Sequence, residues 1–288
     1  MFNSKILSDI NLSIDDINYV NSLVYEAGQL AKLRQEEGSL DIEEKEGPDD
    51  LVTKVDKELN DLIINALHSR FCDDSIISEE QDPDINYCNL NRHWVIDPID
   101  GTNHYVKEND QYSVMVGILI NKKPVAGWVY SPTWNRLFLG IPGDGVYEKI
   151  NNGPIKKLSI KLNQTNPGRK IRIMMGKRNR RKAPKLVERL NNYDFIEMGS
   201  IGLKVAMILD DKADLFIHTN KKLKLWDTVA PTAIALAANL TVTTLENQPF
   251  LFCPEILEHP QTYTVGLQWA INETKYIYDK YLLEETTL

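Results

Sequence analysis

The sequence predicts a layered α+β fold made of two halves, and three observations lead to this prediction. Two amphipathic helical patterns occupy the N-terminal region, a run of short apolar strands joined by turns follows them, and strands then alternate with helices toward the C-terminus. The pattern changes after Asn151-Asn152-Gly153. We therefore expect one half over residues 1–155 and a second half over residues 156–288.

The N-terminal region predicts two helices with a loop between them. Residues 14–35 carry apolar side chains at the period of an amphipathic helix, namely Ile14, Ile17, Val20, Leu23, Val24, Ala27, Leu30 and Ala31. A second helix is indicated by Val55, Leu59, Leu62, Ile63, Ala66 and Leu67. The connecting residues 35–50 are polar and acidic, and we expect a mobile loop there.

The middle of the chain predicts a sheet built largely of hairpins. Apolar runs indicate strands at Ser75–Ser78, His93–Ile96, Ser113–Ile120, Val125–Tyr130 and Arg136–Gly140. Turn residues at Asn121–Lys123 and Ser131-Pro132 separate the last three of them, and Gly143-Asp144-Gly145 leads to a further hairpin. In the second half, strands are expected at 171–175, 195–198 and Leu215–His218, and helices at 183–191, 201–210 and Thr228–Ala238.

Composition narrows the class of protein. The chain has 288 residues and a net charge of -8, which argues against nucleic acid polymers and anionic membranes as partners. The apolar run 112–120 is less than half of a membrane span. The cysteines Cys72, Cys88 and Cys253 form neither a metal-type cluster nor a disulfide framework, which favours a reducing, cytoplasmic location.

The sharpest chemical signal is the segment WVIDPIDGTNHY, residues 94–105. An apolar strand ends there in Asp97 and Asp100, with the carbonyl of Ile99 between them. Asp, Pro and Gly also form ordinary turns, so this segment alone is a weak signal. As a functional site, two carboxylates and a carbonyl offer the oxygen ligands that hard divalent cations prefer. Gly101 would allow a phosphate to approach the backbone amides that follow.

Further acidic residues stand at element ends. Glu79 and Glu80 follow an apolar strand, Asp56 opens the second helix, and Asp227 opens an apolar helix. Taken singly, Glu79 could be the solvated end of a loop. Asp56 could be an acidic residue in the first turn of a helix, and Asp227 could be a helix N-cap. Together they would hold several Mg²⁺ ions and leave positions for water and phosphate oxygens.

No other nucleophile has a sequence signal. The five histidines lack zinc-ligand spacing, and neither a phosphate-binding P-loop, a G-x-S-x-G elbow nor a cysteine nucleophile motif is present. This leaves water activated by a metal ion as the nucleophile.

At these residues the chain resembles the Mg²⁺-dependent, lithium-sensitive phosphatases of the inositol monophosphatase superfamily. The resemblance runs from about Val20 to about Glu273, with the motifs DDLVTKVD, IISEEQ, WVIDPIDGTNHY and KLWDTVAP in family order. It implies a layered αβαβα sandwich of the inositol monophosphatase or fructose-1,6-bisphosphatase type. It also implies a site with about two or three Mg²⁺ ions and a small phosphorylated metabolite as the substrate.

The resemblance assigns roles to individual residues. It implies that the metal ligands are the side chains of Glu79, Asp97, Asp100 and Asp227 and the carbonyl of Ile99. Thr102 would orient and deprotonate the attacking water together with Glu79 or Asp56. The amides of Gly101 and Thr102 would bind the phosphate.

The substrate side resembles the 3′(2′),5′-bisphosphate nucleotidase branch, the CysQ type. The segments GSIGLK and KLKLWDTVAP carry this resemblance, with Ser200, Lys204 and Lys224 as implied substrate-binding residues. The basic segment Lys177–Lys182 is a further candidate for a second phosphate, although such charge runs and lysines are also ordinary surface features. Alternatives are an inositol-1-monophosphatase, a fructose-1,6-bisphosphatase or, more remotely, a non-catalytic metal- or phosphate-binding module. We expect a monomer or homodimer.

Overall fold

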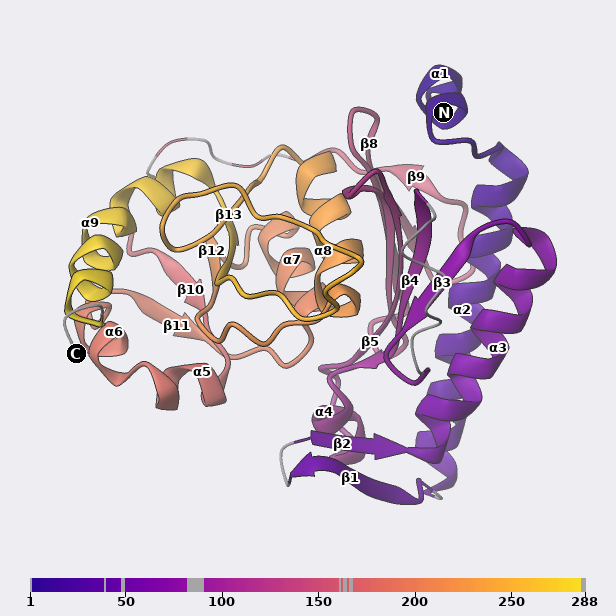
Figure 1. Cartoon of the computed structure of the whole chain (residues 1–288), viewed down its shortest axis with the longest axis horizontal. Helices are drawn as coiled ribbons and strands as arrows, with labels where there is room; N and C mark the ends of the chain where they lie inside the picture. Colours follow the sequence, from indigo (N-terminus) through magenta and orange to yellow (C-terminus); the bar gives the residue numbers. More distant parts are fainter. Residues whose placement is uncertain are drawn as a thin grey trace.

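The chain folds into five layers, as the computed structural model shows (Figure 1). The structure describes residues 2–38, 40–47, 50–81, 91–160, 162, 165 and 168–285. Helices α2 (Ile14–Glu37) and α3 (Lys54–Arg70) cover a seven-stranded sheet, whose other face meets α7 (Ile201–Leu209) and α8 (Leu225–Ala237). A five-stranded sheet follows, with α6 (Pro184–Arg189) and α9 (Gln268–Glu285) on its far side. The predicted layered α+β fold is confirmed.

The seven-stranded sheet has the order β3-β4-β5-β6-β7-β8-β9, with β3 and β4 parallel and the other neighbours antiparallel. Asn121 and Lys122 join β5 to β6 with positive φ angles of 49° and 62°, as a tight hairpin turn requires. The strands are β3 (Ser75–Ser78), β4 (Arg92–Asp100), β5 (Ser113–Ile120), β6 (Lys123–Ser131), β7 (Arg136–Ile141), β8 (Gly145–Ile150) and β9 (Lys156–Lys157).

The five-stranded sheet has the order β11-β10-β12-β14-β13 and is mixed. Its strands are β10 (Arg172–Met174), β11 (Asp194–Ile196), β12 (Leu215–His218), β13 (Thr241–Thr243) and β14 (Tyr263–Gly266). The chain passes from the first sheet to the second between β9 and β10. A domain boundary near residue 155 stays a prediction.

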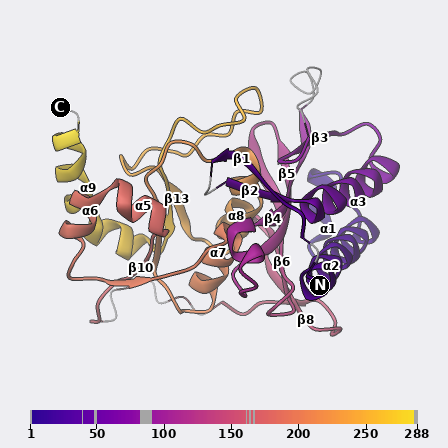
Figure 2. The ribbon, with the colours of Figure 1, turned by 90° about the horizontal axis from the view of Figure 1, so that it is seen from below.

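One sequence expectation is wrong. Residues 35–50 do not form a loop, because α2 continues to Glu37 and β1 (Ile42–Gly47) pairs antiparallel with β2 (Asp50–Thr53). Strand β1 is mostly charged, so no apolar alternation marks it in the sequence. The hairpin contacts the short helix α4 (Thr102–Val106), and it lies at the centre of the view from below (Figure 2).

Several elements had no sequence prediction, namely α1 (Ser4–Asp9), α5 (Lys177–Lys182), β13, β14 and α9. Helix α5 reads in the sequence as a charge run rather than as an amphipathic pattern. Cys72 and Cys253 are free thiols, whereas Cys88 lies outside the described residues. In the described part of the chain, no helix has the length and apolar character needed to cross a bilayer.

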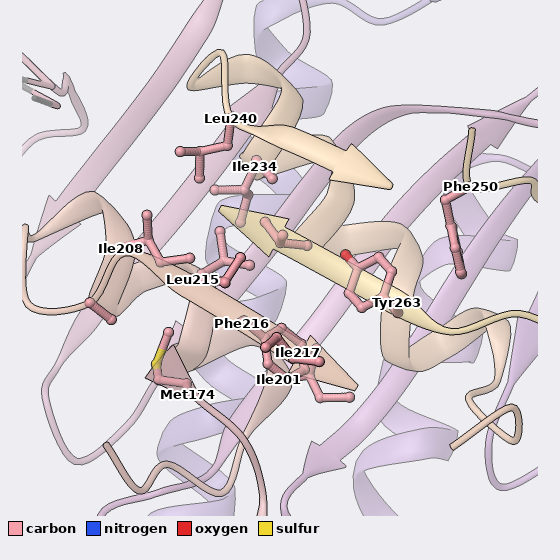
Figure 3. Close-up of a cluster of buried hydrophobic side chains, with 14 of the residues drawn as sticks. Met174, Ile201, Ile208, Leu215, Phe216, Ile217, Ile234, Leu240, Phe250 and Tyr263 are labelled. Atoms are coloured by element: carbon pink, nitrogen blue, oxygen red, sulfur yellow. The ribbon is translucent and has the colours of Figure 1, made fainter. Parts of the chain in front are cut away.

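The apolar core of the second half joins the central helices to the five-stranded sheet. Phe216 of β12 and Tyr263 of β14 pack edge to face with ring centroids 5.9 Å apart. Figure 3 shows how side chains from different elements converge on this cluster, among them Met174, Ile201, Ile208, Leu215, Ile217, Ile234, Leu240 and Phe250. The cluster fixes α7 and α8 against the second sheet.

A row of glycines fixes α8 against the first sheet. Gly117, Gly127 and Gly140 lie side by side on β5, β6 and β7. A Cβ atom on Gly127 would lie 2.3 Å from the carbonyl oxygen of Ala230, and one on Gly140 would lie 2.3 Å from Cα of Ile234. The helix backbone therefore rests directly on the sheet backbone, and this contact sets the depth of α8.

The glycine row gives a first prediction. Gly127→Ala should lower the free energy of unfolding by about 1–3 kcal/mol, because its methyl group meets backbone atoms that cannot rotate away. Urea unfolding measures the change. The control is Gly176→Ala, since a Cβ at Gly176 has its nearest neighbour 4.0 Å away, and it should cost less than about 1 kcal/mol. Equal effects of the two substitutions would contradict this role of the glycine row.

Candidate active site

A β-bulge at the end of β4 brings two carboxylates to one face. Asp97 pairs with Met115 and Asp100 with Ser113, so three steps along β4 match two steps along β5. In a regular strand, residues three apart point to opposite faces of the sheet. The extra residue in β4 cancels this alternation, so Asp97 and Asp100 can serve one site.

Asp97 is the centre of a cluster of acids. Its side chain is buried, and its Oδ1 atom has no hydrogen-bond partner among the described residues. Burial raises the pKa of Asp97 well above its ordinary value, and nearby carboxylates raise it further: Glu79, Asp100, Asp227 and Asp56. The structure thus brings together all the acidic side chains that the sequence analysis assigned to the site.

Asp56 is held by the first turn of α3. Its Oδ2 atom accepts hydrogen bonds from the amide and hydroxyl of Thr53 at 2.7 and 2.6 Å, which completes a capping box. Its Oδ1 atom lies 3.4 Å from the hydroxyl of Thr102, which also donates to the Ile99 carbonyl at 3.0 Å. Asp56 therefore acts as a helix cap and faces the site at the same time.

Asp227 is held in the same way by the first turn of α8. Its Oδ2 atom accepts a hydrogen bond from the Lys224 amide at 2.6 Å. Burial raises the pKa of Asp227 to about 7, against the lowering effect of that hydrogen bond. The adjacent Thr228 hydroxyl lies 2.7 Å from Nε2 of buried His259, a contact that anchors this turn and that no sequence signal indicated.

Asp100 is contacted by α7, which belongs to the second half of the chain. Its Oδ2 atom accepts hydrogen bonds from the Ser200 hydroxyl at 2.5 Å and the Gly202 amide at 2.9 Å. Burial still raises the pKa of Asp100 overall. The predicted substrate residue Ser200 is thus fully buried on a carboxylate.

Lys204 is a buried cation beside these acids. Its Nζ atom donates to the Gly199 carbonyl at 2.6 Å. Burial lowers the pKa of Lys204 to about 8, while the charges of Asp100 and Asp227 act in the opposite direction. Lys204 is therefore not an ordinary surface lysine.

The remaining predicted residues lie around this centre. Gly101 adopts a left-handed conformation with φ 97° as the N-cap of α4, and a Cβ there would meet the Gln111 carbonyl at 2.7 Å. Lys224 is partly exposed and pairs with Glu258 at 2.9 Å. Within α5, Lys177 and Arg180 both pair with Glu197.

The donor set fits a hard cation. It consists of carboxylate oxygens and the Ile99 carbonyl, and Asp97 contributes a buried oxygen without a hydrogen-bond partner among the described residues. Among the described residues, no group of three or more His, Cys, Asp or Glu side chains is arranged so that it could hold a metal ion as it stands. A bound cation would relieve the mutual repulsion of the carboxylates, as the donor chemistry requires.

The raised pKa of Asp227 gives a prediction about stability in chelator. A carboxyl whose folded pKa lies above its unfolded value of 3.8 adds stability at low pH, and this stability is lost as the pH rises through about 7. Asp227→Asn keeps an oxygen acceptor for the helix cap but removes the titration. The free energy of unfolding of the variant minus that of the wild type should therefore increase from pH 4 to 7, as urea unfolding in EDTA can measure.

Asp214 provides the control for this measurement. Its ion pairs with Arg169 and Arg172 hold the pKa of this carboxyl at about 2, despite its burial. Asp214→Asn should lower the stability by a constant amount between pH 5 and 8, since the wild-type group stays ionised there. If the stability difference between Asp227→Asn and the wild type stays constant or falls as the pH rises, the assigned environment of Asp227 is wrong.

Comparisons with known proteins identify the family of the chain. The chain matches the model described as "Inositol monophosphatase family" over residues 15–278. The inositol-1-monophosphatase of Bacillus subtilis (strain 168) is 29% identical over 222 residues, which cover 74% of this chain and 80% of that protein. The 3′(2′),5′-bisphosphate nucleotidase CysQ of Shigella flexneri is 25% identical over 204 residues, which cover 70% of this chain and 80% of that protein.

Solved structures share the fold. The IMPase of Thermotoga maritima superimposes with a TM-score of 0.77 at 22% identity, over 94% of this chain and 99% of that one. The 2′AMP-bound SaIMPase-II gives a TM-score of 0.74 at 22% identity, again over 94% of this chain and 99% of that one. From the family model that spans most of its length, the chain belongs to the inositol monophosphatase family, whose members are phosphatases that hydrolyse phosphomonoesters.

Proposed function

We propose that this phosphatase holds about two or three Mg²⁺ ions at the Asp97 cluster and uses them to hydrolyse a small phosphomonoester with water. The family is generally Mg²⁺-dependent. The observation that carries the proposal is the group of acids around the buried Asp97, whose Oδ1 atom has no hydrogen-bond partner among the described residues. The ligands would be Glu79, Asp97, Asp100, Asp227 and the Ile99 carbonyl.

Thr102 and Asp56 would handle the proton of the attacking water. The Thr102 hydroxyl can pass its proton to Asp56 Oδ1, 3.4 Å away, while it accepts a proton from water. The Gly101 and Thr102 amides, at the start of α4, would bind phosphate oxygens. Bound Mg²⁺ would lower the pKa of the attacking water and neutralise negative charge on the phosphoryl group.

The proposed substrate is a 3′(2′),5′-bisphosphate nucleotide, such as 3′-phosphoadenosine 5′-phosphate, which would give AMP and phosphate. The CysQ relative and the 2′AMP-bound neighbour support a nucleotide. The inositol-1-monophosphatase relative and a neighbour solved with inositol monophosphate support the alternative of an inositol phosphate. Of the implied substrate residues, Lys204 lies beside the acids, whereas Lys224 is paired with Glu258.

Substitutions in the cluster test the catalytic assignment. Asp97→Asn should abolish Mg²⁺-dependent phosphate release, because it removes a charge that binds the cations. Thr102→Val should lower kcat by about 10²–10⁴-fold with a smaller effect on the Mg²⁺ requirement, since its hydroxyl positions and deprotonates water. Phosphate release under saturating Mg²⁺ measures both.

The control is Asp194→Asn, which removes an exposed carboxylate from β11, in the other sheet. It should retain wild-type activity. Full activity of Asp97→Asn at saturating Mg²⁺ would place the site elsewhere, and absence of phosphate release from every phosphomonoester would favour a non-catalytic module.

The substrate assignment predicts a preference. The value of kcat/KM should be about tenfold or more higher for 3′-phosphoadenosine 5′-phosphate than for inositol 1-phosphate, because one charge-assisted contact to phosphate contributes about 1.5–3 kcal/mol. Steady-state assays of phosphate release from the two substrates measure this ratio of kcat/KM values. A preference for inositol 1-phosphate would reject the nucleotidase assignment and leave the phosphatase assignment standing.

A further inference from the structure

The segment that leads into α7 is held against the first half of the chain by Gln111, which lies in the loop before β5. The Oε1 atom of Gln111 accepts a hydrogen bond from the Gly199 amide at 2.8 Å, and its backbone carbonyl accepts one from the Ser200 amide at 3.2 Å. Because a backbone amide only donates, the side-chain oxygen of Gln111 must face Gly199. Gln111 therefore fixes two consecutive amides of the second half of the chain.

The same segment packs closely on α4. A Cβ atom on Gly199 would lie 2.2 Å from Cδ2 of His104, so the Gly199 backbone lies directly against the His104 ring. A shift of this segment would require movement of His104 or the loss of the hydrogen bonds to Gln111. The position of Ser200 is therefore set by residues of the first half.

Ser200 transmits this position to Asp100. It is the N-cap of α7, and its hydroxyl oxygen accepts a hydrogen bond from the Leu203 amide at 3.0 Å. Its hydroxyl proton is donated to Asp100 Oδ2, 2.5 Å away. The Ser113 hydroxyl lies 2.9 Å from the Ser200 hydroxyl and must be the donor there, because Ser200 has given its only proton to Asp100.

Asp100 differs in this respect from the two acids that cap their own helices. Asp56 and Asp227 accept hydrogen bonds from residues three positions away, so local backbone geometry orients them. The partners Ser200 and Gly202 of Asp100 lie about one hundred positions along the chain. The orientation of Asp100 therefore depends on how the start of α7 is held.

We propose that Gln111 is a positioning residue of the metal site, which acts on Asp100 through Gly199 and Ser200. This inference rests on the proposed function, in which Asp100 is a ligand of Mg²⁺. A carboxylate that is already oriented binds a cation more tightly than one that must be ordered on binding. Loss of the Gln111 contact should therefore weaken Mg²⁺ binding more than it changes the chemical step.

The affinity for Mg²⁺ provides the test. Gln111→Met removes the acceptor for the Gly199 amide and keeps the length of the side chain. Loss of a residue that orients a metal ligand directly weakens metal binding by about 10–100-fold, and Gln111 acts one residue further out, so we expect the Kd for Mg²⁺ to rise about fivefold or more. Calorimetry with MgCl₂ and no substrate measures it. The kcat for phosphate release at saturating Mg²⁺ should stay within about threefold of the wild-type value.

Two variants are matched controls. Gln111→Glu keeps an acceptor oxygen, and it should bind Mg²⁺ within about twofold of the wild type or more tightly, since its added charge attracts cations. Asp110→Asn changes the charge of the exposed neighbour and should alter the Kd less than about twofold. Equal weakening by Gln111→Met and Gln111→Glu would overturn the inference. An unchanged Kd in Gln111→Met, with a lower stability, would show a packing role alone and overturn it as well.

Urea unfolding in EDTA separates this inference from the proposed function. If Gln111 acts on Asp100, the factor by which Gln111→Met changes the unfolding equilibrium constant should differ about threefold or more between the wild type and Asp100→Asn. Independent effects of the two substitutions would overturn the inference. If the wild type binds no Mg²⁺, the proposed function fails, and this cycle still decides whether Gln111 positions Asp100. Gln111→Ala replaces Gln111→Met in both measurements if the methionine prevents folding.

Discussion

The mutual repulsion of buried carboxylates is the constraint on which the rest of this structure depends. Asp97 lies in the interior with the charges of Glu79, Asp100, Asp227 and Asp56 close enough to raise its pKa. Such a cluster is costly without compensation. The fold compensates locally: Asp56 and Asp227 cap α3 and α8, and Asp100 accepts hydrogen bonds from the start of α7. The Asp97 Oδ1 atom has no hydrogen-bond partner among the described residues and would be free to bind the proposed cation.

Both halves of the chain are needed to complete this arrangement. The bulged strand β4 and helix α3 come from the first half, whereas α7, Lys204 and α8 come from the second. The glycine row lets α8 rest on the backbone of the first sheet, and this contact sets where Asp227 lies. Loss of close contact between α8 and the sheet would therefore displace Asp227 as well as lower the stability.

Much of the fold and of the candidate site could be predicted because the signals are local. Strands such as Ser113–Ile120 are continuous apolar runs, and Asp56 and Asp227 mark helix starts that are also candidate site positions. The rest depends on contacts between distant segments. The charged strand β1 lacks apolar alternation, and the bulge between Asp97 and Asp100 follows from pairing with β5. The hydrogen bond from Gly199 to Gln111 joins residues 88 positions apart, so no local pattern indicates it.

The stability of the protein with and without Mg²⁺ tests the central claim most directly. In EDTA at pH 8, Asp97→Asn should unfold at a higher urea concentration than the wild type, because it removes one of the repelling charges. Mg²⁺ should stabilise the wild type by about 2.7 kcal/mol at a concentration 100 times its Kd, and the variant by clearly less. A wild type whose stability does not respond to Mg²⁺, together with a variant that is less stable in EDTA, would contradict the account.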